Sequence, residues 1–247
     1  MSGMDMSENI PGDGLLMAAS GLSLKSATTS VPAGQSSAYR LQILGSGGKA
    51  VTHFQVGQTK LLHFYLVRND LTGFEHLHPT LGGDGTWSVE IDPPAAGSYR
   101  VFTQFIGLPS NQPIGLVLSQ PLTVTGSSSP AVPLPGPASS TQVDGYTLTI
   151  AGDLNVGRAS PLTVTVTKDG QPVTDLQPYL DTYAHLTFHE GDLGFAHLHP
   201  SGVVNGDHGG PTLQFDAQLM EAGNYRLFLQ FRTAGVLHTA QVTLAIA

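Results

Sequence analysis

AGSYRVFTQF at residues 96–105 recurs as AGNYRLFLQF at residues 222–231. Each copy begins with a small-residue turn and continues as a run of alternating or β-branched and aromatic residues. Such runs are typical of β-strands with one face on a hydrophobic core. Because the same strand appears once in each half of the chain, the sequence predicts two related domains.

The similarity between the halves extends well beyond this strand. Residues 51–63 match residues 173–185 without a gap, and residues 73–79 match residues 194–200 after one extra residue, Thr72. Between the halves, GSSSPAVPLPGPASS at residues 126–140 is rich in proline and serine, a composition typical of an extended, semi-rigid linker. The predicted organisation is a flexible tail at residues 1–20, a first domain at 21–125, a linker at 126–142 and a second domain at 143–247.

Short strand-like runs separated by turn clusters fill both halves. The turns include GGDG at 82–85, DPPAAG at 92–97 and NGDHGGP at 205–211, and no segment shows sustained helical periodicity. This spacing is that of β-sandwiches. We therefore expect an all-β protein made of two tandem Ig-like or cupredoxin-like β-sandwich domains.

Composition excludes several function classes. The 247 residues include only 10 Lys and Arg against 18 Asp and Glu, and the formal net charge is −8. Such a chain has no basic surface for nucleic acid. With no cysteine it has neither disulfides nor thiolate metal sites. The low charge and abundant Gly, Ser and Thr suggest an exported protein, although the N-terminus does not read as a signal peptide and no apolar run predicts membrane insertion.

Histidines recur at one place in both repeats, as FEHLHP at 74–79 and FAHLHP at 195–200. Residues i and i+2 of a strand point to the same side, so His197 and His199 project together. If the hairpin closes symmetrically around Asp192, His185 lies opposite His199 and Thr187 lies opposite His197. Three imidazoles would then converge on one metal ion.

Further histidines are candidate ligands for two expected metal sites, one in each domain. His238 is a fourth candidate in the second domain, where we expect the principal site. The first domain places His63, His76 and His78 at the equivalent positions, with His53 as a weaker candidate. There Leu118 replaces His238 and Thr72 lengthens the hairpin, so the first site is expected to be weaker or altered.

An all-imidazole donor set suits copper or zinc, and no thiolate is present for a blue-copper centre. Met1, Met4 and Met6 are soft donors that can hold Cu(I). The alternative interpretation is that the histidines were structural residues in a duplicated ancestor. A single H-x-H motif is weak evidence for a metal, and the repeated motif with its upstream histidine is stronger.

Other recurrent residues favour structural roles. Asp70 and Asp192 fit Asx turns, while Tyr99 and Tyr225 are expected to pack at a sandwich edge. No phosphate-binding loop, nucleophile elbow or catalytic carboxylate pair is found, so we do not expect an enzyme. The competing functions are a structural or adhesive tandem module without metal and, more weakly, a copper redox protein.

The chain resembles a known family over nearly everything after residue 20. VRNDLTGFEHLHP at 67–79, DLQPYLDTYAHLTFHEGDLGFAHLHP at 175–200 and GVLHTAQVTL at 235–244 resemble a largely uncharacterised family of exported, chiefly actinobacterial proteins sometimes labelled heavy-metal-binding. The resemblance implies secretion or lipid anchoring outside the membrane. For a metal-binding protein we also expect a metal-delivery or membrane protein as partner. It places His185, His197, His199 and His238 in recurrent motif positions. The family usually has Gly-Ala at Asp181-Thr182, a departure that concerns the local turn.

Overall fold

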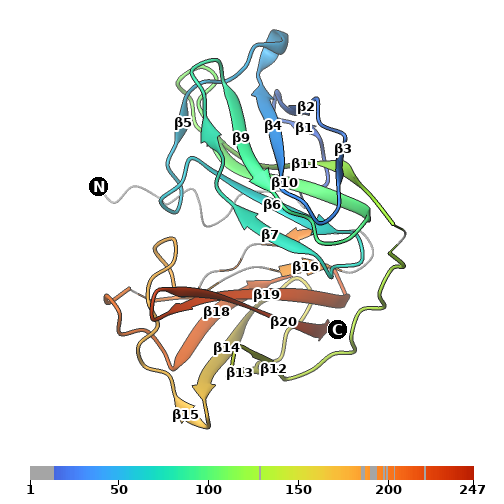
Figure 1. Cartoon of the computed structure of the whole chain (residues 1–247). Coiled ribbons are helices and arrows are strands. Elements are labelled where there is room, and N and C mark those ends of the chain that lie inside the picture. Colours follow the sequence, from blue (N-terminus) through green and yellow to red (C-terminus); the bar gives the residue numbers. More distant parts are fainter. Residues whose placement is uncertain are drawn as a thin grey trace. The chain divides into compact units, whose positions relative to one another are not determined.

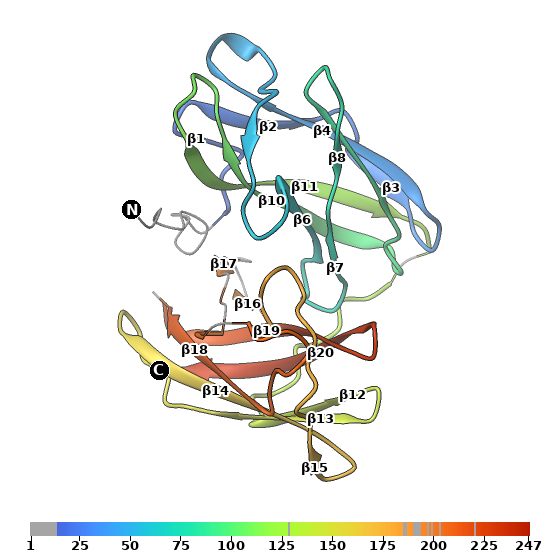
Figure 2. The same cartoon turned by 90° about the vertical axis from the view of Figure 1, so that its left-hand side faces the viewer.

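The computed structural model describes an all-β protein (Figure 1). The described residues are 14–127, 129–184, 187–189, 194–196, 198, 200–202, 204–219 and 221–247. Apart from a short 3-10 turn at Ser46–Gly48, every regular element in these ranges is a strand. Contacts divide the chain between Pro133 and Leu134, inside the predicted linker. Each half is a two-sheet sandwich, which confirms the predicted fold class (Figure 2).

The first domain has one sheet in the order β1-β2-β4-β9-β8 and another in the order β3-β11-β10-β6-β7, with β5 paired to β10. The strands of the first sheet are β1 (Ala18–Ala19), β2 (Leu22–Ser26), β4 (Ser37–Leu44), β9 (Thr86–Ile91) and β8 (Thr80–Leu81). Those of the second are β3 (Ser30–Pro32), β11 (Ile114–Thr125), β10 (Gly97–Gly107), β6 (Leu62–Arg68), β7 (Phe74–Leu77) and β5 (Phe54–Gln55).

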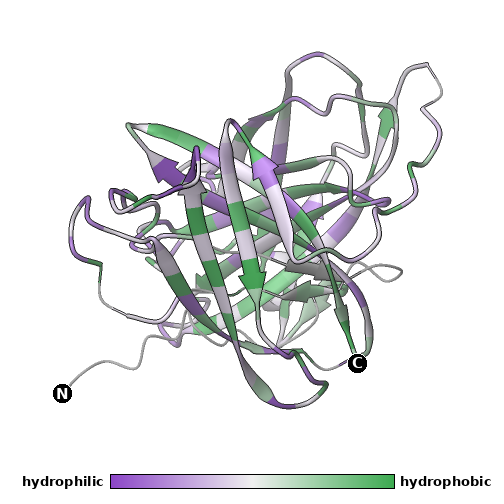
Figure 3. Cartoon of the chain, turned by 90° about the horizontal axis from the view of Figure 1, so that it is seen from below, coloured by the Kyte–Doolittle hydropathy of each residue, from purple (hydrophilic) through white to green (hydrophobic). Residues whose placement is uncertain are grey.

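Alternation along the strands builds the core of this domain. The core cluster takes Tyr39, Leu41 and Ile43 from β4, and Phe64 and Leu66 from β6. Figure 3 shows hydrophobic and hydrophilic residues alternating along many strands. Burying each such large apolar side chain contributes about 1.5–3 kcal/mol. The packing fixes which residues of β6 face the core, and therefore which face the other way.

A tyrosine hydrogen bond recurs at the corresponding sandwich corner of both domains. The hydroxyl of Tyr99 donates to the carbonyl of Ala95 at 2.9 Å, and that of Tyr225 donates to the carbonyl of Glu221 at 3.1 Å. Bonds of this kind, from a strand-start tyrosine to backbone a few residues upstream, are a hallmark of Ig-like sandwiches. Both tyrosines are buried, and the edge position stays a prediction.

The second domain has β12-β13-β14-β15 in one sheet, with β18 paired to β14, and β17-β16-β19-β20 in the other. The first sheet contains β12 (Ser140–Val143), β13 (Tyr146–Ala151), β14 (Ala159–Lys168), β15 (Gln171–Pro172) and β18 (Thr212–Gln218). The second contains β17 (Phe195–Ala196), β16 (Thr187–His189), β19 (Gly223–Thr233) and β20 (Val236–Ile246). Its core cluster includes Leu148, Val164, Leu229 and Phe231.

The first domain extends beyond the predicted limits at both ends. At its start, β1 lies within the predicted tail, and the carbonyl of Leu16 accepts a hydrogen bond of 2.9 Å from the Ser119 amide. At its end, residues 129–132 of the predicted linker dock on the loop between β6 and β7. These backbone hydrogen bonds order segments whose composition alone indicates flexibility.

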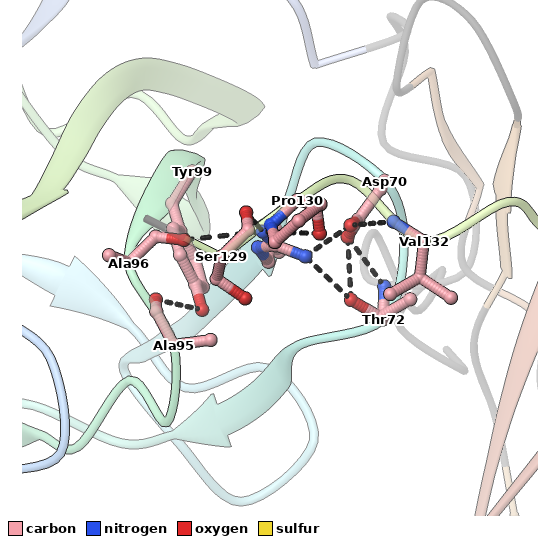
Figure 4. Close-up of polar contacts among 9 residues, drawn as sticks. Asp70, Thr72, Ala95, Ala96, Tyr99, Ser129, Pro130 and Val132 are labelled. Carbon is pink, nitrogen blue, oxygen red and sulfur yellow. Dashed lines mark hydrogen bonds and ion pairs between the residues drawn. The ribbon is translucent and has the colours of Figure 1, made fainter. Parts of the chain in front are cut away.

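Two charged side chains hold the docked linker (Figure 4). Arg68 is 5% exposed, pairs with Asp70, and donates to the carbonyl of Ser129 at 2.7 Å. Asp70 in turn accepts from the amide of Val132 at 3.0 Å and from that of Thr72 at 3.2 Å. The bond to Thr72 is the predicted Asx turn. We call Arg68 and Asp70 the linker clamp.

Candidate metal centre

The histidines of the first domain lie on the β6–β7 hairpin. Phe64 of β6 is paired with Leu77 and belongs to the core, so His63 and Tyr65 point to the opposite face. His76 is paired with Tyr65, and their rings stack with centroids 4.3 Å apart. His78 follows β7 immediately and returns to the side of His63. Strand alternation therefore brings the three histidines together.

The three rings are close enough to share one ion. The Nδ1 atom of His63 lies 3.3 Å from the Nε2 atom of His76. The ring centroid of His78 is 5.2 Å from that of His63 and 4.9 Å from that of His76. One nitrogen from each ring can be chosen so that all lie within 4.8 Å of one another. Two nitrogens each about 2.0 Å from a tetrahedral zinc or copper ion are about 3.3 Å apart.

A backbone carbonyl fixes the proton on His63. The Nε2 atom of His63 is 3.0 Å from the carbonyl oxygen of Gly57, which can only accept. Nε2 therefore carries the proton, and the Nδ1 lone pair faces His76. Outer hydrogen bonds of this kind orient the histidine ligands of metal sites. Without a metal, Nε2 of His76 donates a hydrogen bond to Nδ1 of His63. A cation bound to both nitrogens would displace that proton.

Burial keeps His63 and His78 uncharged. It lowers the pKa of His63 to about 4, with the Gly57 carbonyl opposing and Lys60 adding to the effect. It lowers the pKa of His78 to about 3, helped by His63 and Lys60. Both imidazoles are thus neutral at pH 7, the form that binds metals. The Nε2 atom of His78 is also buried, and no described residue hydrogen-bonds to it. An unsatisfied buried nitrogen costs about 1–3 kcal/mol, and a metal ion would satisfy it.

The site expected to be the principal one is only partly described. His185, His197 and His199 lie outside the described residues, as do Met1, Met4 and Met6, so their ligand roles stay predictions. The expected pairing of the second hairpin was wrong. Thr187 lies opposite Ala196, one residue before the expected partner.

Loop length explains this register. The last paired residues are Val67 and Phe74 in the first hairpin and Phe188 and Phe195 in the second. Residues 68–73 and residues 189–194 connect them, so both connections have the same length. The second repeat has one residue fewer than the first. Its two hairpin strands pair one position away from the register of the first hairpin, and the connection between them therefore keeps its length. The predicted counterpart of His238 was also wrong, because Phe105 pairs with Leu116 where Phe231 pairs with His238.

His238 lies at the end of a hydrogen-bond chain in the second domain. Lys168 donates to Tyr146, whose hydroxyl is 2.7 Å from Oγ1 of Thr233. Nε2 of His238 is 3.0 Å from that oxygen, and its Nδ1 is 2.8 Å from Asp144. Because lysine can only donate, the donors follow one another along the chain. Tyr146 donates to Thr233, Thr233 donates to Nε2 of His238, and Nδ1 of His238 donates to Asp144. Both ring nitrogens are thus used within the protein. Thr233 is 3% exposed, and its hydroxyl lies within this chain of hydrogen bonds.

We expect His238→Leu to lower the stability of the second domain without changing metal binding by the first. Leucine fills the volume but leaves the buried Thr233 hydroxyl without its acceptor, at a cost of about 1–3 kcal/mol. Urea unfolding measures the loss, with His208→Leu in an exposed loop as control. A fall in metal stoichiometry at unchanged stability would instead make His238 a ligand.

The remaining sequence candidate in the first domain does not join the histidines. His53 is exposed, and its Nδ1 atom lies 3.1 Å from the hydroxyl of Thr52. The three convergent residues are His63, His76 and His78 alone among the described residues.

A sequence model of one family matches residues 18–111 and 141–247, which is most of both sandwiches. The chain belongs to this family, a domain of unknown function (DUF8832). The match in two segments parallels the internal repeat of the DUF8832 chain. No curated protein matches its sequence significantly. Within the described residues, no helix is both long and apolar enough to cross a membrane.

Solved structures similar to this DUF8832 chain include three from bacteria. The FdeC adhesin of Escherichia coli is 19% identical with a TM-score of 0.30, and the match covers 97% of this chain and 66% of that one. A Salmonella alpha-2-macroglobulin mutant is 13% identical with a TM-score of 0.32, over 98% of this chain and 15% of that one. Fibronectin(III)-like modules of Clostridium thermocellum CbhA are 9% identical, with a TM-score of 0.25, over 90% and 92%. The chain thus spans less than two thirds of the first two structures.

Proposed function

We propose that this protein binds a copper or zinc ion at His63, His76 and His78 of its first domain. The observation that carries the proposal is the convergence of three imidazoles, of which His63 and His76 are buried and His78 has a buried nitrogen with no described hydrogen-bond partner. All-nitrogen donor sets suit these ions. We assign the protein a binding role in metal storage, delivery or resistance, and no catalytic one.

We also propose that the protein works outside the cytoplasm. The low charge, the abundant Gly, Ser and Thr and the resemblance to exported proteins support this placement. A metal-binding protein there would exchange its ion with a delivery or membrane protein. The repeated histidines at 185, 197 and 199 remain candidates for a second site, supported by sequence alone.

Metal titration of the apo protein tests the proposal. We expect at least one equivalent of Cu(I), Cu(II) or Zn(II) to bind, and thermal unfolding to shift upward with the ion. At a free concentration 100 times the dissociation constant, the gain is about 2.7 kcal/mol. Protein prepared without a histidine tag should be analysed for metal content before and after loading. Binding of no ion would leave a structural or adhesive tandem module as the better interpretation.

A further inference from the structure

A strained turn precedes His63 in the first domain. Gly57 and Lys60 exchange backbone hydrogen bonds of 2.9 and 3.1 Å, and both residues between them have positive φ angles, 48° at Gln58 and 66° at Thr59. Positive φ at both central positions is the mark of a type I′ turn, which favours asparagine and glycine. Glutamine and β-branched threonine therefore hold this backbone at a cost in free energy.

The second domain repeats this turn with different residues. Tyr179 and Thr182, the counterparts of the two bonded residues in the first turn, exchange backbone hydrogen bonds of 2.8 and 3.3 Å. Between them, φ is 55° at Leu180 and 60° at Asp181. No residue of the turn is the same in the two copies, yet the strained backbone is retained, which points to a role for its shape. In the sequence, a histidine stands three positions after each turn.

In the first domain, the turn delivers a carbonyl to one nitrogen of His63. The carbonyl oxygen of Gly57 lies 3.0 Å from Nε2 of His63 and can only accept, so it holds the proton on that nitrogen. His63 is 4% exposed, and a flipped ring would give up this hydrogen bond inside the protein. The unprotonated Nδ1 therefore stays directed at Nε2 of His76, which is 3.3 Å away.

We propose that the turn at residues 57–60 is a positioning element of the metal site, through which His63 binds the ion with Nδ1 while His76 and His78 bind it with Nε2. This inference rests on the proposed function and specifies how the ion is held. The Nε2 atom of His78 is buried without a described partner, and that of His76 already faces Nδ1 of His63. Outer hydrogen bonds fix the tautomer and orientation of ligand rings, and their loss weakens metal binding about 10- to 100-fold.

Long-range 1H–15N spectra of the full chain labelled with 15N-histidine report which ring nitrogen carries a proton. In the apo protein we expect both His63 and His76 to be protonated on Nε2, because His76 then donates to Nδ1 of His63. Zn(II) and Cu(I) both have filled d shells and leave such spectra sharp. On loading with either ion, His63 should keep its Nε2 proton. His76 should move its proton to Nδ1, because the ion takes Nε2.

Two substitutions at one position test the turn itself. Proline fixes φ near about −65°, so Thr59→Pro breaks the turn while keeping its two hydrogen-bond donors, which belong to Gly57 and Lys60. Glycine adopts positive φ freely, so Thr59→Gly removes the same side chain and keeps the turn. We expect Thr59→Pro to lower metal affinity about tenfold or more, and Thr59→Gly to leave it within about twofold of the wild type. Asn111→Pro, at an exposed positive-φ residue of the same domain, is the control and should leave the affinity unchanged. Competition titrations followed at the His63 ring signals measure the affinity.

The outcomes separate this inference from the proposed function. If the wild type takes up none of Cu(I), Cu(II) and Zn(II), the proposed function itself fails. The metal site stands and the positioning role of the turn is refuted if metal binds but His63 carries its apo proton on Nδ1. Equal affinities of Thr59→Pro and Thr59→Gly would refute that role as well. If Thr59→Pro does not fold, the spectra of the wild-type protein decide.

Discussion

His78→Leu is expected to abolish tight metal binding while leaving the apo protein at least as stable as the wild type. Removing one of three ligands from a buried site should weaken binding by about 100-fold or more. At the same position, leucine replaces a ring whose Nε2 atom is buried without a described partner. Removing an unsatisfied polar atom is neutral or stabilising in the absence of metal.

His78→Leu is informative because metal affinity is expected to fall while the stability of the apo protein is expected to stay the same or rise. A purely structural histidine would lose stability on substitution, whereas a ligand kept for function is commonly maintained at the expense of stability. Metal affinity comes from titration and apo stability from urea unfolding. His53→Leu, at an exposed histidine of the same domain, should change neither quantity. Undiminished metal uptake by His78→Leu would remove His78 from the site.

Asp70→Asn is expected to lower the stability of the first domain by about 3 kcal/mol and to expose the docked linker to proteases. Arg68 is buried, and asparagine leaves its charge uncompensated, which is the costly way to break a buried ion pair. The NH2 group of the new asparagine side chain would also face another donor, either the Arg68 guanidinium or the backbone N–H of Val132. Urea unfolding measures the stability, and limited proteolysis followed by mass spectrometry locates cleavage near residues 129–132.

The same clamp predicts a loss of stability in acid. Burial raises the pKa of Asp70, but hydrogen bonds from Thr72 and Val132 and the charge of Arg68 outweigh it, so the net pKa lies below its ordinary 3.8. A carboxyl whose folded pKa is lowered stabilises the protein above its unfolded pKa, and that stability is lost as the pH falls further. The wild type should therefore lose its advantage over Asp70→Asn below about pH 4. Asp153→Asn, at an exposed aspartate, is the charge control. An equal loss in both variants would mean that the clamp contributes nothing.

The sequence alone predicted the fold class, the repeat and the histidine hairpin, because each depends on local periodicity. Strand alternation places His76 and His78 on one side, and the register of the β6–β7 hairpin adds His63 to them. The same local pattern predicted the Asx turn at Asp70. The aligned tyrosines Tyr99 and Tyr225 likewise pointed to matching corners, since a repeated motif implies a repeated environment.

Features that depend on distant contacts were not predictable. Nothing local to residues 129–132 indicates that a buried arginine more than sixty residues earlier holds them. The partners of His238 include Asp144, which precedes it by 94 positions. The turn that brings the Gly57 carbonyl to His63 was also missed, because its positive φ angles fall on Gln58 and Thr59, residue types that do not signal such a turn.

The shared connection length of the two hairpins bears on how duplicated domains diverge. Successive side chains on a strand point to opposite surfaces, so a displacement of one position exchanges them. Thr187, the counterpart of Tyr65, accordingly pairs with Leu227, whereas Tyr65 pairs with Phe102, the counterpart of Phe228. A difference of one residue in length can thus shift the pairing of a hairpin strand in one gene copy while the order of the strands is kept.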